Sequence, residues 1–92
     1  LPTPRAGTAA VAVKGQLVVI GGESLRQVSA HNEVEAYNPA TKQWQTWPAL
    51  PSGRHGTQAT LHNGVLYIAA GSGNRGGGPE LHDLLLLPLA AF

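Results

Sequence analysis

The sequence contains two copies of one pattern at a constant distance. Arg5 is matched by Arg54, 49 positions later, and the same offset holds over the first 22 positions. One residue is then inserted, after which segment 32–34 aligns with segment 82–84. A period near 50 residues is typical of an array of four-stranded β units and not of a helical solenoid.

Each copy begins with a predicted β-hairpin. In the first copy an apolar run is broken at Lys14-Gly15, and a second apolar run follows at 17–20. In the second copy the break is Asn63-Gly64, followed by the apolar run 65–70. An Asn-Gly pair is a strong hairpin signal, because both central positions tolerate a positive φ.

The first copy continues into two further predicted strands. A polar loop at 23–32 leads to a third strand at 33–37, a turn at 38–41 and a fourth strand at 43–47. The second copy reaches a third strand at 84–87, and no tryptophan-bearing fourth strand follows. The pattern therefore predicts an all-β chain of antiparallel units.

Together these residues resemble the kelch repeat. The resemblance rests on Arg5, the Lys14-Gly15 turn, Ile20-Gly21-Gly22, Tyr37-Asn38-Pro39, Trp44 and Leu50-Pro51. The second copy begins again at Arg54-His55-Gly56, but has Ala70-Gly71 where the family prefers two glycines. The resemblance implies two kelch-type four-stranded antiparallel blades of a β-propeller. Blade 1 is expected at 1–49, and blade 2 at 50–92 with its fourth strand missing.

The size of the chain bears on ring closure. A closed propeller needs about four to eight blades, and 92 residues provide two. We therefore expect a fragment of a larger ring. Its expected neighbours are further blades, from the same parent chain or from other copies.

Composition excludes several classes of function. The formal net charge is +1 and no basic stripe is present, so nucleic acid is not an expected partner. Cysteine is absent, and no pair of the four histidines has the spacing of zinc ligands on one element, so neither a metal nor a cofactor is expected. The apolar segment 84–92 has nine residues, too few for a membrane span.

Candidate ligand-binding residues follow from the resemblance. It implies that the loop after each fourth strand and the long loop after each second strand share a ligand-facing rim. The candidates are Arg5, Arg26, Arg54, His55, Asn74 and Arg75. Arginine forks bind carboxylates and phosphates. The alternative for the repeated arginines is structural, namely that they tie loops together.

Three functions are compatible with these features. The favoured one is a non-catalytic binding module that presents rim loops to a protein or glycan ligand. The alternative is a fragment of a sugar-active kelch propeller enzyme, galactose-oxidase-like or sialate-isomerising. Against it, no copper constellation is visible, since Tyr37 and Tyr67 occupy strand positions. The third is a structural piece that only completes a ring.

Four further interpretations concern single segments. Thr8–Val13 is nearly all apolar, which predicts a strand buried on both faces. Glu33 and Glu35 are two apart on a strand and are expected on its solvent-exposed face instead of forming an acid–base pair. Trp44 is expected to pack in the core, and Trp47 to cover a blade edge.

Segment 71–76 spells G-x-G-x-x-G after a strand. A dinucleotide site needs a helix to begin there, and the Gly77-Gly78-Pro79 that follows prevents one. We interpret the segment as a loop on the ligand face, with Asn74, Arg75 and Glu80 as its polar contacts.

Overall fold

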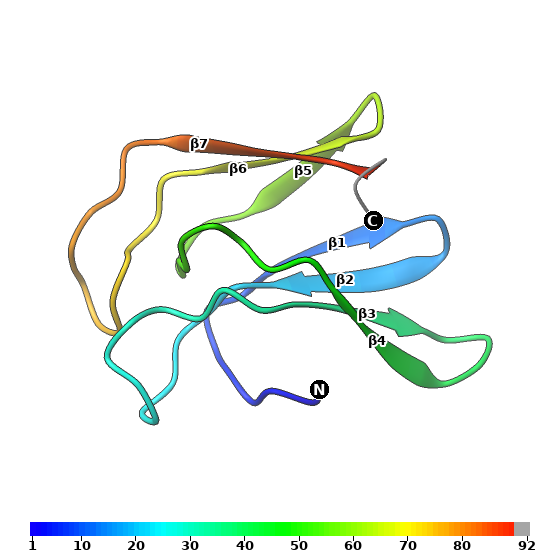
Figure 1. Ribbon diagram of the computed structural model, residues 1–92, viewed down its shortest axis with the longest axis horizontal. Coiled ribbons are helices and arrows are strands. Elements are labelled where there is room, and N and C mark those ends of the chain that lie inside the picture. Colours follow the sequence, from blue (N-terminus) through cyan, green and yellow to red (C-terminus); the bar gives the residue numbers. More distant parts are fainter. Residues whose placement is uncertain (90–92) are drawn as a thin grey trace.

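The structure is a computed structural model that describes residues 1–89 and contains only β-strands as regular elements (Figure 1). The strands are β1 (Ala9–Val13), β2 (Gln16–Ile20), β3 (Val34–Asn38), β4 (Gln43–Trp47), β5 (Ala59–His62), β6 (Val65–Ala69) and β7 (Leu84–Pro88). The all-β prediction is confirmed. In the described part of the chain, no helix is long and apolar enough to cross a membrane.

The strands form two antiparallel sheets. One has the order β1-β2-β3-β4 and the other β5-β6-β7. The first strands of the two sheets, β1 and β5, contact each other, so the sheets lie side by side (Figure 1). No fourth strand pairs with β7 within residues 1–89. The last three residues of the predicted second blade lie outside the described part.

Both predicted hairpin turns are present. Lys14 and Gly15 have φ of 49° and 78°, and Asn63 and Gly64 have φ of 48° and 75°. Two consecutive positive φ angles in a two-residue loop define the turn whose twist matches that of the flanking strands. The local sequence signal therefore decided the register of β1 with β2 and of β5 with β6.

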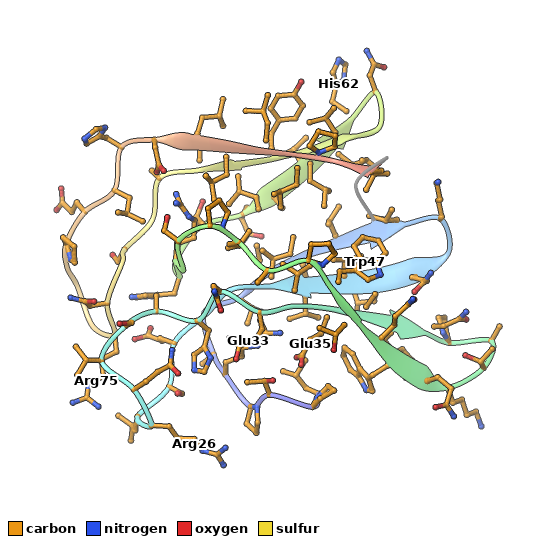
Figure 2. The ribbon with its side chains drawn as sticks, viewed as in Figure 1. Arg26, Glu33, Glu35, Trp47, His62 and Arg75 are labelled. Carbon is orange, nitrogen blue, oxygen red and sulfur yellow. The ribbon has the colours of Figure 1, made fainter. Side chains whose placement is uncertain are left out.

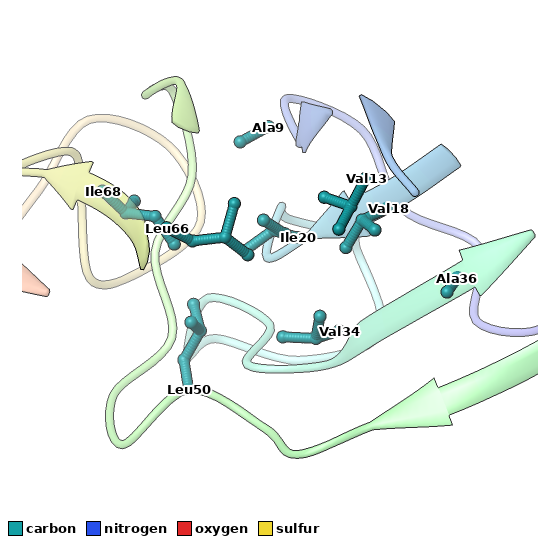
Figure 3. Close-up of a cluster of buried hydrophobic side chains, with 9 residues drawn as sticks. All are labelled: Ala9, Val13, Val18, Ile20, Val34, Ala36, Leu50, Leu66 and Ile68. Atoms are coloured by element: carbon teal, nitrogen blue, oxygen red, sulfur yellow. The ribbon is translucent and has the colours of Figure 1, made fainter. Parts of the chain in front are cut away.

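The hydrophobic core lies between the two sheets (Figure 3). Its buried members are Ala9, Val13, Val18, Ile20, Val34, Ala36, Leu50, Leu66 and Ile68. Both sheets contribute, and Leu50 comes from the connector between them. Burial of a large aliphatic side chain is worth about 1.5–3 kcal/mol, so this shared core holds the two sheets together.

The prediction that the first strand is buried on both faces is wrong. Along β1, Ala9 and Val13 are buried, whereas Ala10 and Ala12 are exposed. Successive side chains of a strand point to opposite faces. The core covers one face of β1, and the part of the chain that the structure describes leaves Ala10 and Ala12 on the other face uncovered.

The predicted roles of the two tryptophans are reversed. Trp47 packs against the core (Figure 2), while Trp44 is half-buried against Tyr37, with ring centroids 5.1 Å apart. The two tryptophans are three positions apart on β4, so they point to opposite faces. Only one of them can therefore reach the core, and the register of β3 with β4 assigns that place to Trp47, opposite Val34.

Candidate functional site

Three long connections meet at one end of the molecule, opposite the hairpin turns (Figure 1). They are the β2–β3 loop (21–33), the β4–β5 connector (48–58) and the β6–β7 loop (70–83), and we call them together the loop rim. No helix begins in the glycine-rich β6–β7 loop, as the sequence predicts for this G-x-G-x-x-G string.

The β2–β3 and β6–β7 loops are bonded to each other across the two sheets. Ala30 N donates to Gly73 O at 2.9 Å, and Arg75 N donates to Val28 O at 2.7 Å. Arg75 Nη1 also donates to Leu25 O at 3.0 Å. The two loops therefore form one joint surface, which neither sheet provides alone.

Glu23 and His55 link all three segments of the loop rim. His55 Nδ1 lies 3.0 Å from Glu23 Oε2, and its Nε2 lies 2.7 Å from Asn74 O. Glu23 Oε1 accepts a hydrogen bond of 2.9 Å from Gly76 N. Both ring nitrogens of the buried His55 thus face oxygen atoms, one from each long loop. Glu23 was not among the site residues predicted from the sequence. The only sequence signal for it is its position directly after the Gly21-Gly22 pair.

A hollow of about 510 Å³ opens between the two long loops. Its lining residues are Ala6, Glu23, Ser24, Leu25, Arg75 and Gly76. A carboxylate and a guanidinium, from different loops, therefore border the same space. This combination suits a ligand that carries both an acidic group and hydrogen-bond donors.

Arg5 lies behind the loop rim in a buried ion pair. Its Nη2 is 2.7 Å from Glu35 Oε1, and the exposed fractions of the two side chains are 0% and 5%. Arg5 also donates to the carbonyl of Gly21, and Thr3 Oγ1 donates to Glu35 Oε2 at 2.8 Å. The prediction that Glu35 faces solvent is therefore wrong, because Thr3 and Arg5 of the N-terminal segment cover the carboxylate on the face of β3 opposite the core.

The same contacts determine the protonation of Glu35. Burial by itself would raise the pKa of this carboxyl. The hydrogen bonds from Arg5 and Thr3 outweigh burial, so the pKa of Glu35 lies below its ordinary value. Glu35 is thus held as a carboxylate and is suited to structure more than to proton transfer.

Arg54 makes the corresponding pair in the second sheet. Its Nη1 and Nη2 lie 2.7 and 3.1 Å from the two carboxylate oxygens of Asp83. It also donates to Ala70 O at 3.1 Å and to Ser52 Oγ at 3.0 Å. The hydrogen bond from Arg54 holds the pKa of Asp83 below its ordinary value. The inward direction of both arginines supports the structural alternative, in which they tie loops together.

The six candidate residues thus fall into two groups. His55, Asn74 and Arg75 lie together at the loop rim, and the exposed Arg26 lies on the β2–β3 loop (Figure 2). The remaining two, Arg5 and Arg54, are buried in ion pairs. Ligand binding by any of the six stays a prediction.

A second histidine network lies on the β2–β3 loop. His31 is 3% exposed; its Nε2 lies 2.7 Å from Ser24 Oγ and its Nδ1 lies 2.9 Å from Glu33 Oε1. Burial would raise the pKa of Glu33, but hydrogen bonds from its own backbone and from His31 outweigh it and lower this pKa. The sequence shows these residues seven and two positions apart, a spacing that matches no recognised motif.

The histidines do not converge on one point. His31 and His55 contact different carboxylates, those of Glu33 and Glu23, and His62 lies against Tyr67 with ring centroids 6.4 Å apart. Across residues 1–89, no group of three His, Asp or Glu side chains is arranged to hold a metal ion.

Comparisons with known proteins give consistent matches. A family model described as the Kelch motif matches residues 4–51. The N-acetylneuraminate epimerase of Yersinia enterocolitica is 38% identical over 78 residues, which cover 78% of this chain and 20% of the epimerase. The human Kelch repeat and BTB domain-containing protein 3 is 33% identical over 70 residues, which cover 74% of this chain and 11% of that protein. The chain therefore spans a fifth or less of the length of these relatives.

A solved structure described as "Structure of YjhT" has a similar fold. It matches with a TM-score of 0.65 and 30% sequence identity. The match covers 76% of this chain and 22% of that chain. The likeness therefore extends over most of the two sheets described above.

Proposed function

The chain belongs to the kelch-repeat family, and on this premise we propose that it is a non-catalytic binding module whose loop rim takes a protein or glycan ligand. The observation that carries the proposal is the hollow of about 510 Å³ between the two long loops. Ligand pockets typically measure about 300–1,000 Å³, so the hollow has room for one sugar unit or one large side chain.

The polar groups of the hollow favour a ligand with an acidic group. Arg75 donates one hydrogen bond to Leu25 O, and a guanidinium has five N–H donors in a planar fork. Within residues 1–89 the guanidinium therefore keeps donors for a carboxylate, which such a fork binds in a bidentate manner. Glu23 also lines the hollow. Its oxygens accept from Gly76 N and face His55 Nδ1, and each keeps a lone pair for a hydroxyl or amide group of a ligand.

The tip of the β2–β3 loop favours a protein as the other class of ligand. Leu25 and Val28 are 90% and 60% exposed, and Arg26 lies between them. Exposed apolar side chains next to arginine are typical of protein interfaces. The hollow and this loop tip adjoin, because Leu25 belongs to both.

A second candidate function is participation in a sugar-isomerising propeller. The observation that favours it is the 38% identity to a protein named N-acetylneuraminate epimerase. N-acetylneuraminate carries a carboxylate, which is the group that Arg75 suits. In this case the hollow would be part of a substrate site, and turnover would accompany binding.

The test uses N-acetylneuraminate as the probe, titrated into the full chain and followed by backbone amide NMR. We expect chemical-shift changes confined to segments 21–33 and 70–78. Arg75→Ala should weaken the apparent affinity at least tenfold, and Arg75→Lys should weaken it nearly as much because a lysine has no fork. Lys42→Ala, at the opposite end of the molecule, is the matched control. New proton signals of an epimer in the same samples would favour the second candidate.

The proposal that the loop rim binds a protein is tested by selecting binders from a random-peptide display library. Selected peptides should lose binding to the Leu25→Ser variant and keep it for Lys42→Ala. If neither the sugar nor any peptide depends on the loop rim, the proposed function is rejected.

A further inference from the structure

We propose that Ser24 is a nucleophilic serine, activated by His31 and oriented through Glu33, and that it accepts the acyl group of small carboxylic esters bound in the rim hollow. The inference goes beyond the proposed function, which gives the hollow a binding role alone, by adding a reaction there, and it does not depend on which ligand the loop rim takes. It rests on the distances among the three side chains, the protons they share, and the position of Ser24 at the wall of the hollow.

The distances are those of a hydroxyl–imidazole–carboxylate relay. Ser24 Oγ and His31 Nε2 are 2.7 Å apart, and His31 Nδ1 and Glu33 Oε1 are 2.9 Å apart. A nucleophile and its base need to be within about 2.6–3.2 Å, with the base oriented by a third group. The order of atoms, with Nε2 toward the serine and Nδ1 toward the acid, is also that of known serine relays.

The hydrogen bonds are compatible with activation of the serine. Arg26 N donates to Ser24 Oγ at 3.3 Å, and the hydroxyl donates to His31 Nε2 when the neutral ring carries its proton on Nδ1. The lowered pKa of Glu33 makes it a carboxylate, so His31 Nδ1–H donates to it. The neutral imidazole with its proton on Nδ1 is the tautomer that can remove a proton from serine.

The surroundings expose the nucleophile and shield the base. His31 is 3% exposed, so its ring is held away from water. Ser24 is only partly buried and lines the hollow together with Leu25, Arg75 and Gly76. An ester in this space would lie beside Ser24, and Arg75 would favour one with an anionic substituent.

Ser24 and His31 have no matching residues in the second copy of the repeat. At the offset of 49, Ser24 falls on Gly73; at the offset of 50 that applies after the inserted residue, His31 falls on Leu81. The second sheet thus forms without either residue, while the buried arginine is present in both copies. The Ser24–His31 contact is therefore specific to the first copy and is not part of the pattern that the two sheets share.

The reaction is a balanced two-step transfer. Ser24 Oγ attacks the ester carbonyl carbon while its proton moves to His31 Nε2. The bond from that carbon to the alcohol oxygen breaks, and the proton passes from Nε2 to the departing oxygen. Water then attacks the acyl-serine, gives a proton to Nε2, and the bond to Oγ breaks as that proton returns to Oγ. The sum is ester plus water giving acid plus alcohol.

The first test is covalent labelling of the full chain with diisopropyl fluorophosphate, which transfers its phosphoryl group to activated serines with loss of fluoride. We expect one adduct, located on Ser24 by peptide mass spectrometry and formed at least a hundredfold faster than on Ser29. The matched control is Ser29→Ala, since Ser29 lies exposed on the same loop. An absent adduct, or one distributed equally over Ser24 and Ser29, would overturn the inference.

The second test follows hydrolysis of 4-nitrophenyl acetate. Ser24→Ala should reduce the rate to that of buffer, and Ser29→Ala should leave it unchanged. The pH dependence of the rate is recorded for each variant, because only the neutral imidazole acts as the base. Glu33→Gln should lower the rate at least tenfold and alter this pH profile, as expected of a positioning residue. An unaltered rate and profile in Glu33→Gln would contradict its assigned role. A chain that is not labelled at Ser24 can still bind the sugar or the peptides. The two proposals are therefore tested separately.

Discussion

The two sheets contain the same buried arginine but pair it with different carboxylates. Arg5 pairs with Glu35, which lies within β3, and Arg54 pairs with Asp83, which directly precedes β7. The carboxylate side chains also differ in exposure, with fractions of 5% for Glu35 and 47% for Asp83. The first pair is therefore closed off from water, whereas the second is open on its acidic side.

The alignment of the repeat makes this difference informative. Asp83 is the sequence counterpart of Glu33, and the counterpart of Glu35 is Leu85, which packs against the core. In the second sheet the acid before the strand serves the arginine. In the first sheet Glu35 takes over that task, so Glu33 is available to His31. The carboxylate that pairs with the arginine thus lies two positions later in the first sheet than in the second. Glu33 is therefore free of that pair and contacts His31.

The glycine positions after β2 and β6 differ in a second way. Gly21 has a φ of 66°, and a Cβ added there would lie 2.3 Å from Arg54 O. Its counterpart Ala70 has a φ of 56° and tolerates a side chain. Both positions need the left-handed backbone, but only Gly21 is approached so closely by the next sheet's connector. The close packing of the two sheets, more than the turn, requires glycine at position 21.

The largest expected effect is on the buried pair. Glu35→Gln removes the carboxylate with which the buried Arg5 is paired, which should cost about 3–5 kcal/mol of the free energy of unfolding. Asp83→Asn should cost clearly less, because water reaches the acidic side of that pair. Urea unfolding of both variants measures the difference, and equal losses would show that exposure does not distinguish the two pairs.

Gly21→Ala is expected to come next. The left-handed backbone costs an alanine about 1–2 kcal/mol, and the overlap with Arg54 O adds about 1–3 kcal/mol. The control is Gly15→Ala, with a φ of 78° and no atom within 4 Å of an added Cβ, which should show the backbone cost alone. If thermal unfolding gives the two variants the same midpoint, the sheets do not pack as closely as described.

Lowering the pH should weaken the ion pair between Arg5 and Glu35 and thereby lower the free energy of unfolding. Because the pKa of Glu35 is lower in the folded state than its ordinary 4.5, its contribution is complete above that value and is lost as pH falls toward the folded pKa. The free energy of unfolding should therefore decrease below about pH 4.5. In Glu35→Gln this part of the decrease should disappear. A decrease of the same slope in both proteins would assign it to other carboxylates.

The smallest effect is expected at Ala70. Ala70→Gly removes a left-handed cost of about 1–2 kcal/mol and adds a loss of chain entropy of about 0.5–1 kcal/mol. The net gain should be about 1 kcal/mol or less, visible as a small rise in the urea midpoint. A decrease would mean that the methyl group of Ala70 contributes packing that outweighs its backbone strain.

The sequence by itself determined the strands, the turns and the family. β4 begins and ends at the predicted residues, the Lys14-Gly15 and Asn63-Gly64 turns have the predicted positive φ, and the kelch resemblance is confirmed. These features depend on residues close in the chain, such as a glycine pair after an apolar run. Local preference and the two-residue period of a strand are therefore sufficient to predict them.

Only the tertiary structure decided how side chains distant in the sequence combine. Glu23, which follows the first sheet's β2, meets His55, which precedes the second sheet's β5, and Arg5 of the N-terminal segment covers Glu35, which the sequence predicted to face water. Whether Trp47 or Trp44 reaches the core likewise depends on which face of β4 is turned toward the core, and the register of β3 with β4 decides this. The local pattern cannot encode these outcomes, because each is decided by competition among partners that only the packing of the two sheets brings together.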